Sequence, residues 1–150
     1  MEFVTDRSIE HVNMLKRLHD KGWHDMSSSE QKSWYAEAAK GAYNYTDLNR
    51  VESAVAELAE LLGLTLTTKT DWSLWDIPVQ ADMERYLNNI IAVRGASGGT
   101  GFPSLPSSMS KLNYESANNI EKTLQIVYRS LTTSSSELGE FVLGESTLGG

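Results

Sequence analysis

Apolar side chains recur at three- and four-residue steps along most of this chain, and that spacing restricts its fold more than any other feature. The clearest stretch steps by four, three and four residues: Val51, Val55, Leu58 and Leu62. Such steps place the side chains on one face of an α-helix. Alternation typical of strands is confined to residues 64–68, which favour one short extended segment that needs a pairing partner. The sequence therefore predicts an all-α fold.

Start and stop signals divide the pattern into five predicted helices. These cover about residues 6–20, 27–41, 46–63, 78–95 and 114–133. Ser27 and Glu30 form an S-x-x-E capping box, in which each side chain accepts from the other residue's N–H. Thr46 is the predicted cap of the third helix, and Gly63 stands where a left-handed residue ends it. We expect the first four helices to form one domain over residues 1–95.

Beyond this domain the composition changes. Residues 96–108 are dominated by Gly, Ser and Pro, which is typical of a linker. The amphipathic helix that follows, within residues 109–133, carries a seam at heptad spacing: Ala117, Ile120, Leu124, Val127 and Leu131. Two partners fit this seam, either the N-terminal domain or copies of the same helix. Residues 134–150 are predicted to form an extended tail, flexible or partner-bound, with one apolar anchor: Phe141, Val142 and Leu143.

Charge and cysteine content exclude several classes of function. The chain has no cysteine, which excludes disulfides, thiolate metal sites and a cysteine nucleophile. Its formal net charge of −7 disfavours nucleic acid as a partner, because an acidic surface repels phosphate. No apolar run approaches the roughly 18 residues of a membrane span, and the charged start predicts no signal peptide. We therefore expect neither a nucleic-acid nor a membrane partner.

A search for catalytic and metal-binding motifs predicts no site of either kind. His11 and His19 share a helical side without an evident third metal ligand. Asp71 and Asp76 fit turn and helix caps better than a carboxylate pair across a cleft. The glycines of residues 95–101 lack the Lys and the Ser or Thr of a phosphate-binding loop. We expect no cofactor, and a glycan hydrolase that uses Asp71 or Asp76 remains as a third-ranked alternative.

Aromatic residues are concentrated in the predicted N-terminal domain: Trp23, Trp34, Tyr35, Tyr43, Tyr45, Trp72, Trp75 and Tyr86. They indicate either a small aromatic core, since each ring buries about 150–250 Å², or a hot-spot surface for a partner protein. Tyr45 and Trp75 lie in predicted loops and are the candidates for such a surface. Stacking of these rings on a saccharide is a third interpretation.

Several strings occur in a fixed order along most of the chain: GAYNYTDLNRVE, KTDWSLWDIP, QADMERYLNNI, LPSSMSKLNYESANNIEKTL and the terminal FVLGESTLGG. Together they resemble a family of structural proteins of phages and prophages of Gram-positive bacteria, described as minor tail or baseplate-associated proteins. The resemblance implies a part of the virion rather than an activity. It implies a location in the phage tail, after assembly in the host cytoplasm.

From the residues and the resemblance together we expect a non-enzymatic virion structural protein, an adaptor that joins two components at the tail, baseplate or fibre. Its partners would be other virion structural proteins, and we expect a homo-oligomer, a trimer or hexamer, in the particle. The heptad seam itself favours three or four strands over two. The expected partner-binding residues are Tyr45, Trp75, Ile120, Leu124, Val127, Leu131, Phe141, Val142 and Leu143. The alternative is a phage-encoded soluble assembly factor or binding module that the particle does not retain.

Overall fold

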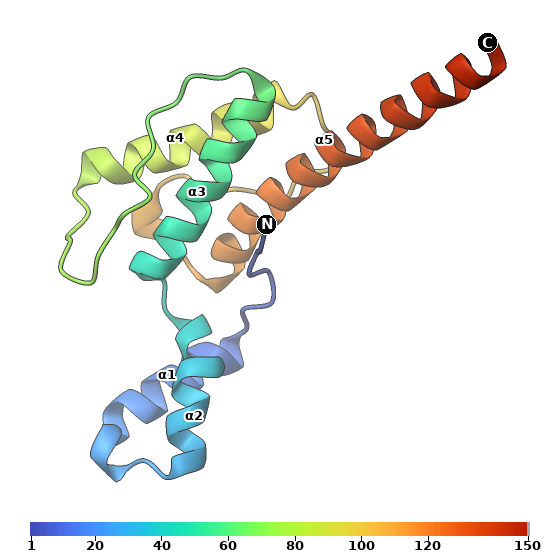
Figure 1. Ribbon diagram of the computed structural model, residues 1–150. Helices are drawn as coiled ribbons and strands as arrows, with labels where there is room; N and C mark the ends of the chain where they lie inside the picture. Colours follow the sequence, from blue (N-terminus) through green and yellow to red (C-terminus); the bar gives the residue numbers. More distant parts are fainter. Residues whose placement is uncertain (150) are drawn as a thin grey trace.

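A computed structural model of the chain describes the backbone of residues 1–149 and the side chains of residues 1–133. Within that part every regular element is helical, which confirms the all-α prediction (Figure 1). The helices are α1 (Ile9–Lys21), α2 (Ser28–Ala36), α3 (Tyr45–Leu62), α4 (Gln80–Ala96) and α5 (Tyr114–Gly149). Short 3-10 turns are η1 (Trp23–Asp25), η2 (Ala38–Gly41) and η3 (Met109–Lys111). Residues 64–68 form no strand.

Helix ends follow the local capping chemistry of the sequence. The capping box of Ser27 and Glu30 opens α2 as predicted, and Gly63 ends α3 with a φ of 70°. The predicted cap of α3 at Thr46 is wrong. Asn44 takes that position, because its side-chain Oδ1 accepts from the Thr46 N–H at 2.9 Å while the Asp47 side chain accepts from the Asn44 N–H.

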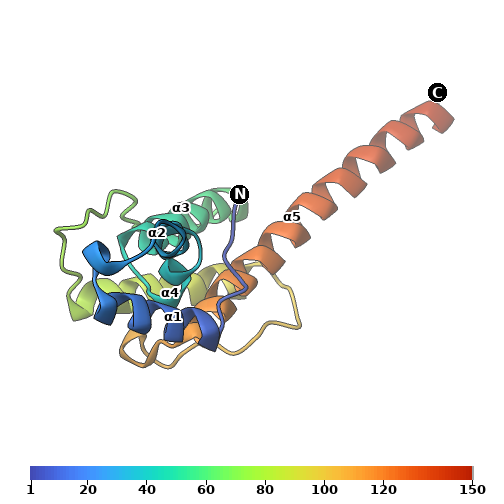
Figure 2. The ribbon, with the colours of Figure 1, turned by 90° about the horizontal axis from the view of Figure 1, so that it is seen from below.

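The main hydrophobic core lies between α3, α4 and the N-terminal half of α5. Twelve buried side chains form it: Leu48, Val51, Ala54, Val55, Leu58, Trp72, Tyr86, Ile90, Val93, Ile120, Leu124 and Val127. The loop between α4 and α5 returns the chain, so that α5 lies against α3 and α4 (Figures 1 and 2). The seam of α5 therefore packs back on the preceding helices, which is the first of its two predicted partners.

A second, smaller cluster holds α1 and α2 together. Its buried members are Leu18, Met26 and Ala38, with Trp34 packed against them. The backbone of η2 crosses α1 so closely that a Cβ on Gly41 would lie 2.5 Å from the His11 carbonyl oxygen. Because the buried side chains divide into this hairpin and the α3–α4–α5 core, a single domain over residues 1–95 is not confirmed.

The backbone of α5 continues as helix to Gly149, whereas the sequence predicts an extended tail from residue 134. No proline interrupts this stretch, and a glycine inside a helix costs only about 1 kcal/mol. The predicted anchor of Phe141, Val142 and Leu143 lies outside the residues whose side chains the structure describes.

Candidate functional site

The long connection between α3 and α4 is fixed at its base by a buried tryptophan. Trp72 is only 5% exposed, and its indole Nε1 donates to Glu52 Oε2 at 2.6 Å. The Asn49 side chain accepts from the Trp72 N–H at 2.7 Å and donates to the Trp72 carbonyl oxygen at 2.8 Å. These contacts join the loop to α3 at both its side chain and its backbone.

The buried Glu52 carboxylate lies at the centre of the contacts that fix the foot of this loop. It accepts from the Lys69 N–H at 2.9 Å and from two guanidinium nitrogens of Arg85 on α4, at 2.5 and 3.2 Å. The hydrogen bond to Glu52 raises the pKa of Arg85 above its ordinary value. Arg85 and Asn89 both donate to the Thr67 carbonyl oxygen. The loop is thus held from α3 on one side and from α4 on the other.

The tip of the same loop, residues 73–79, exposes a run of large apolar side chains, and we name it the docking loop. The exposed fractions are 67% for Leu74, 86% for Trp75, 86% for Ile77 and 59% for Val79. A local turn fixes its shape, since Asp76 accepts from the Ser73 N–H at 2.8 Å and its own N–H donates to the Ser73 carbonyl oxygen. A rigid loop that holds apolar groups in water is typical of a binding surface.

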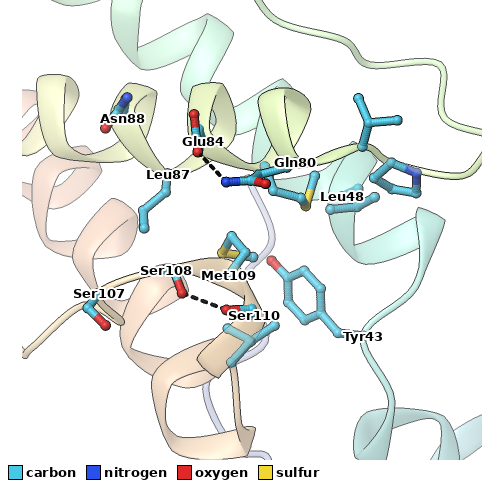
Figure 3. Close-up of a pocket in the computed structure, with 14 residues that line it drawn as sticks. Tyr43, Leu48, Gln80, Glu84, Leu87, Asn88, Ser107, Ser108, Met109 and Ser110 are labelled. Atoms are coloured by element: carbon cyan, nitrogen blue, oxygen red, sulfur yellow. Dashed lines mark hydrogen bonds between the residues drawn. The ribbon is translucent and has the colours of Figure 1, made fainter.

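A groove of about 810 Å³ adjoins the docking loop and lies between α4 and η3 (Figure 3). Its apolar lining includes Tyr43, Leu48, Val79, Met83, Leu87 and Met109. Its polar rim consists of Gln80, Glu84, Asn88, Ser107, Ser108 and Ser110. Leu87 reaches into it from α4 and Met109 from η3 (Figure 3). Pro78 and Val79 belong both to the docking loop and to the groove, so the two form a continuous surface.

This surface is acidic. Residues 69–85 contain four carboxylates, Asp71, Asp76, Asp82 and Glu84, and two basic residues, of which Arg85 is paired with the buried Glu52. Asp71 pairs with Lys69 at 3.0 Å, which lowers the pKa of the carboxyl. Asp76 accepts a hydrogen bond from the Ser73 N–H, and Asp82 accepts one from the Val79 N–H at the start of α4. Asp76 therefore caps a turn, which is the type of role that the sequence predicts for it. Carboxylates at this edge favour a partner with basic groups around its contact.

A second exposed aromatic surface lies at the end of the α1–α2 hairpin. Trp23 in η1 and Tyr35 in α2 stack edge to face, with ring centroids 5.7 Å apart. They are 42% and 73% exposed. Figure 1 shows this end of the hairpin apart from the loop between α3 and α4. Among residues 1–133, the surface of Trp23 with Tyr35 is therefore separate from the surface that exposes Trp75.

The structure separates the sequence-predicted binding residues into exposed and buried groups. Trp75 lies at the exposed tip of the docking loop, and Tyr45 is 36% exposed in the first turn of α3. Ile120, Leu124 and Val127 are fully buried in the main core, and Leu131 is half-buried against it. The assignment of Ile120, Leu124 and Val127 as partner contacts is therefore wrong, because the folded-back helix already buries them against α3 and α4, whereas that of Leu131 stays a prediction.

Several residues of these surfaces were missed by the sequence reasoning. Leu74, Ile77 and Val79 accompany Trp75, and their signal was an apolar run without helical period between capping aspartates. Trp23 and Tyr35 belong to the aromatic set predicted to form either a core or a hot-spot surface, but they were not selected as surface candidates. The α4–η3 groove was not predictable, because its two walls come from distant parts of the chain.

Among residues 1–133, a cluster of buried charge pairs two arginines with two carboxylates. Arg7, before α1, binds Glu121 of α5 at 2.7 Å and Asp47 of α3 at 3.0 Å. Arg50 binds the same two carboxylates. Among the residues whose side chains are described, no group of three His, Asp or Glu is arranged to hold a metal ion. This cluster joins the N-terminal segment to the core.

Comparison with known proteins yields no relative, since no family model, no curated protein and no solved structure matches the chain. Within the described part of the chain, no helix is both long and apolar enough to span a bilayer. We therefore infer the function from the fold and the exposed surfaces.

Proposed function

We propose that the chain is a non-enzymatic adaptor that joins two other proteins, and that these are structural components of a phage virion at the tail, baseplate or fibre. One observation carries the adaptor function: the two exposed aromatic surfaces, Trp23 with Tyr35 and the docking loop, lie on different parts of the molecule. The virion assignment rests on the resemblance of the sequence to phage tail proteins.

The physical basis is the composition of energetic hot spots. Tryptophan and tyrosine dominate such positions, because a rigid ring buries a large area with little loss of rotamer entropy. Trp75 at 86% exposed leaves nearly its whole ring available to a partner. The hydrogen bonds that fix Trp72 and Asp76 hold the loop before the partner arrives, which lowers the entropic cost of binding.

The arrangement of the adaptor follows from the division of the chain into the α1–α2 hairpin and the α3–α4–α5 core. The α1–α2 hairpin presents one surface to a first component, and the α3–α4–α5 core presents the docking loop to a second. The copy number of three or six would be set by the symmetry of the tail. It would not arise from the seam of α5, because Ile120, Leu124 and Val127 are buried within the chain.

The test is the composition of purified virions from a phage that encodes this chain. We expect mass spectrometry to find the protein in fixed stoichiometry and labelling to place it on the tail. The paired changes Trp75→Ala with Ile77→Ala, and Trp23→Ala with Tyr35→Ala, should each reduce incorporation at least about tenfold. Leu61→Ala is the matched control, because Leu61 is 57% exposed on α3 outside both surfaces.

Circular dichroism would show that each variant keeps its helical content. Wild-type protein that is present in infected cells but absent from particles would contradict the virion assignment. That result would instead support a soluble assembly factor or binding module. Normal incorporation of both double variants would contradict the assignment of the two surfaces.

A further inference from the structure

The α4–η3 groove combines apolar walls with a polar rim, which suits an amphipathic helix. Two unbranched, flexible side chains stand on its opposite walls, Met83 on α4 and Met109 on η3, and Leu87 follows Met83 one turn later on α4. Methionine adapts to apolar side chains of different shapes, and for that reason it recurs at surfaces that bind amphipathic helices. The volume of about 810 Å³ is large for a cavity and sufficient for several apolar side chains.

We infer that this groove binds one amphipathic helix of the partner protein, with its apolar face on Met83, Leu87 and Met109 and with Lys or Arg along its flanks. The inference rests on the proposed function of the docking loop and names the chemical class of its partner. The exposed side chains of Leu74, Trp75 and Ile77 would then pack against the side of the same helix or its neighbour.

A helix fits this place better than an extended strand. Strand addition needs an exposed sheet edge with unpaired backbone groups, and the described part of the chain contains no sheet. The groove instead presents side chains, with serine hydroxyls along the η3 wall. Ser108 and Ser110 bond to each other at 2.7 Å, so these two hydroxyls already have a partner without a ligand backbone.

The charge of the groove determines which charge we expect on the flanks of the bound helix. Glu84 is the one charged residue among those that line the groove, and the adjoining Asp76 and Asp82 add negative charge. The two basic residues nearby are paired, Lys69 with Asp71 and Arg85 with the buried Glu52. The nearest basic residue in η3, Lys111, is exposed and is not part of the lining. An anionic membrane or a second copy of this chain, with its net charge of −7, would meet repulsion here. A helix with basic flanks meets attraction.

The test uses the full chain and a synthetic helical peptide of about 18 residues, or five turns, with Leu on one face and Lys on the other. A second peptide carries Glu in place of each Lys. We expect the basic peptide to shift backbone NMR signals of residues 78–88 and 107–112 and to bind more weakly as salt rises. We expect at least about tenfold weaker binding of the acidic peptide.

Two variants locate the contact, each with a matched control. Asn88→Trp fills the groove from an exposed position of α4, and Ser53→Trp adds the same ring on the exposed side of α3. Glu84→Lys reverses the charge of the lining, and Glu60→Lys makes the same change outside it. We expect binding to fall at least about tenfold for each groove variant and to stay unchanged for each control.

Equal binding of the two peptides would overturn the charge assignment, and NMR shifts outside the groove, or none, would overturn the groove as a helix site. Protection of the same residues by neutral phosphatidylcholine vesicles would assign the surface to lipid instead. Concentration-dependent shifts without peptide would assign it to a second copy. Peptide binding by a protein that is absent from virions would leave this inference standing while the proposed function fails.

Discussion

At the scale of single residues, the fold depends on two buried carboxylates. Glu121 is fully buried and accepts from the Val4 N–H and from the guanidinium groups of Arg7 and Arg50. Glu52, beneath the docking loop, accepts hydrogen bonds in the same way from the Lys69 N–H, the Trp72 indole and the Arg85 guanidinium. Each carboxylate joins three separate parts of the chain. A buried charge is stable only while its partners remain, so these two positions are the most sensitive to substitution.

Glu121→Gln should destabilise the protein by about 3–5 kcal/mol. The change removes the negative charge while the buried Arg7 guanidinium, 2% exposed, keeps its positive charge. Urea unfolding followed by circular dichroism measures the effect. Glu60→Gln, an exposed carboxyl of α3, is the control and should change stability by less than about 0.5 kcal/mol. Similar stability of the two variants would show that the buried network contributes little.

Glu30 should make the α1–α2 hairpin sensitive to acid. Hydrogen bonds from the Lys21 ammonium at 2.7 Å and the Ser27 N–H at 3.1 Å lower the pKa of Glu30 from 4.5 to about 2. Because the folded-state pKa is depressed, the stabilisation is complete above pH 4.5 and is lost as the pH falls through about 2. An NMR titration of the Glu30 carboxyl should show the low midpoint.

The same hairpin gives a second readout of this titration. The protection factors of the α1 and α2 amides against hydrogen exchange should fall between pH 4.5 and about 2 in the wild type. In Glu30→Gln they should already be lower at neutral pH and should lose that part of their pH dependence. A Glu30 midpoint near the ordinary value of 4.5 would contradict the prediction.

At the scale of elements, close backbone approach decides how the hairpin packs. η2 crosses α1 at Gly41, where the nearest atoms to an added Cβ belong to the backbone of His11 and Val12. Backbone atoms of a helix cannot move aside as a side chain can. Glycine is needed at this crossing for close contact rather than for a positive φ.

Gly41→Ala should destabilise the protein by about 1–3 kcal/mol, because the added Cβ would lie 2.5 Å from the His11 carbonyl oxygen. Gly95→Ala is the matched control, since nothing lies within 4 Å of its added Cβ in the last turn of α4. We expect that change to be neutral or to stabilise by up to about 1 kcal/mol. Urea unfolding of both variants provides the measurement. Equal effects would show that the crossing relaxes freely.

At the scale of the whole molecule, the two hydrophobic clusters have unequal size. The α3–α4–α5 core contains twelve buried side chains, whereas the α1–α2 hairpin contains three. The hairpin is joined to the core by the segments around Arg7 and Tyr43, which stack at 5.4 Å. In the proposed adaptor, this division would let one surface adjust without disturbing the other.

The hairpin should open before the core. Native-state hydrogen exchange in low urea should give α1 and α2 amides a lower opening free energy than those of α3 and α4, because less apolar surface holds them. Leu18→Ala should lower the opening free energy of the hairpin alone, since Leu18 is fully buried in the smaller cluster. Val55→Ala in the main core is the control and should affect both parts. One common opening free energy for all helices would contradict this division.

The sequence by itself determined the helices and much of their ends. Steps of three and four residues specify helices without tertiary information, and the capping box of Ser27 and Glu30 and the left-handed Gly63 act within a few residues. The exposure expected of Trp75 also followed from local signals, since capping aspartates and Pro78 interrupt the helical period around it.

Only the tertiary structure decided which faces meet. Heptad spacing shows that the seam of α5 must be covered but not by what, and folding back buries Ile120, Leu124 and Val127 within the same chain. The pair of Arg7 and Glu121 lies 114 positions apart in sequence, and no local pattern predicts a contact at that separation. The α4–η3 groove likewise exists only because η3 returns to α4, since a groove is a property of two surfaces brought together.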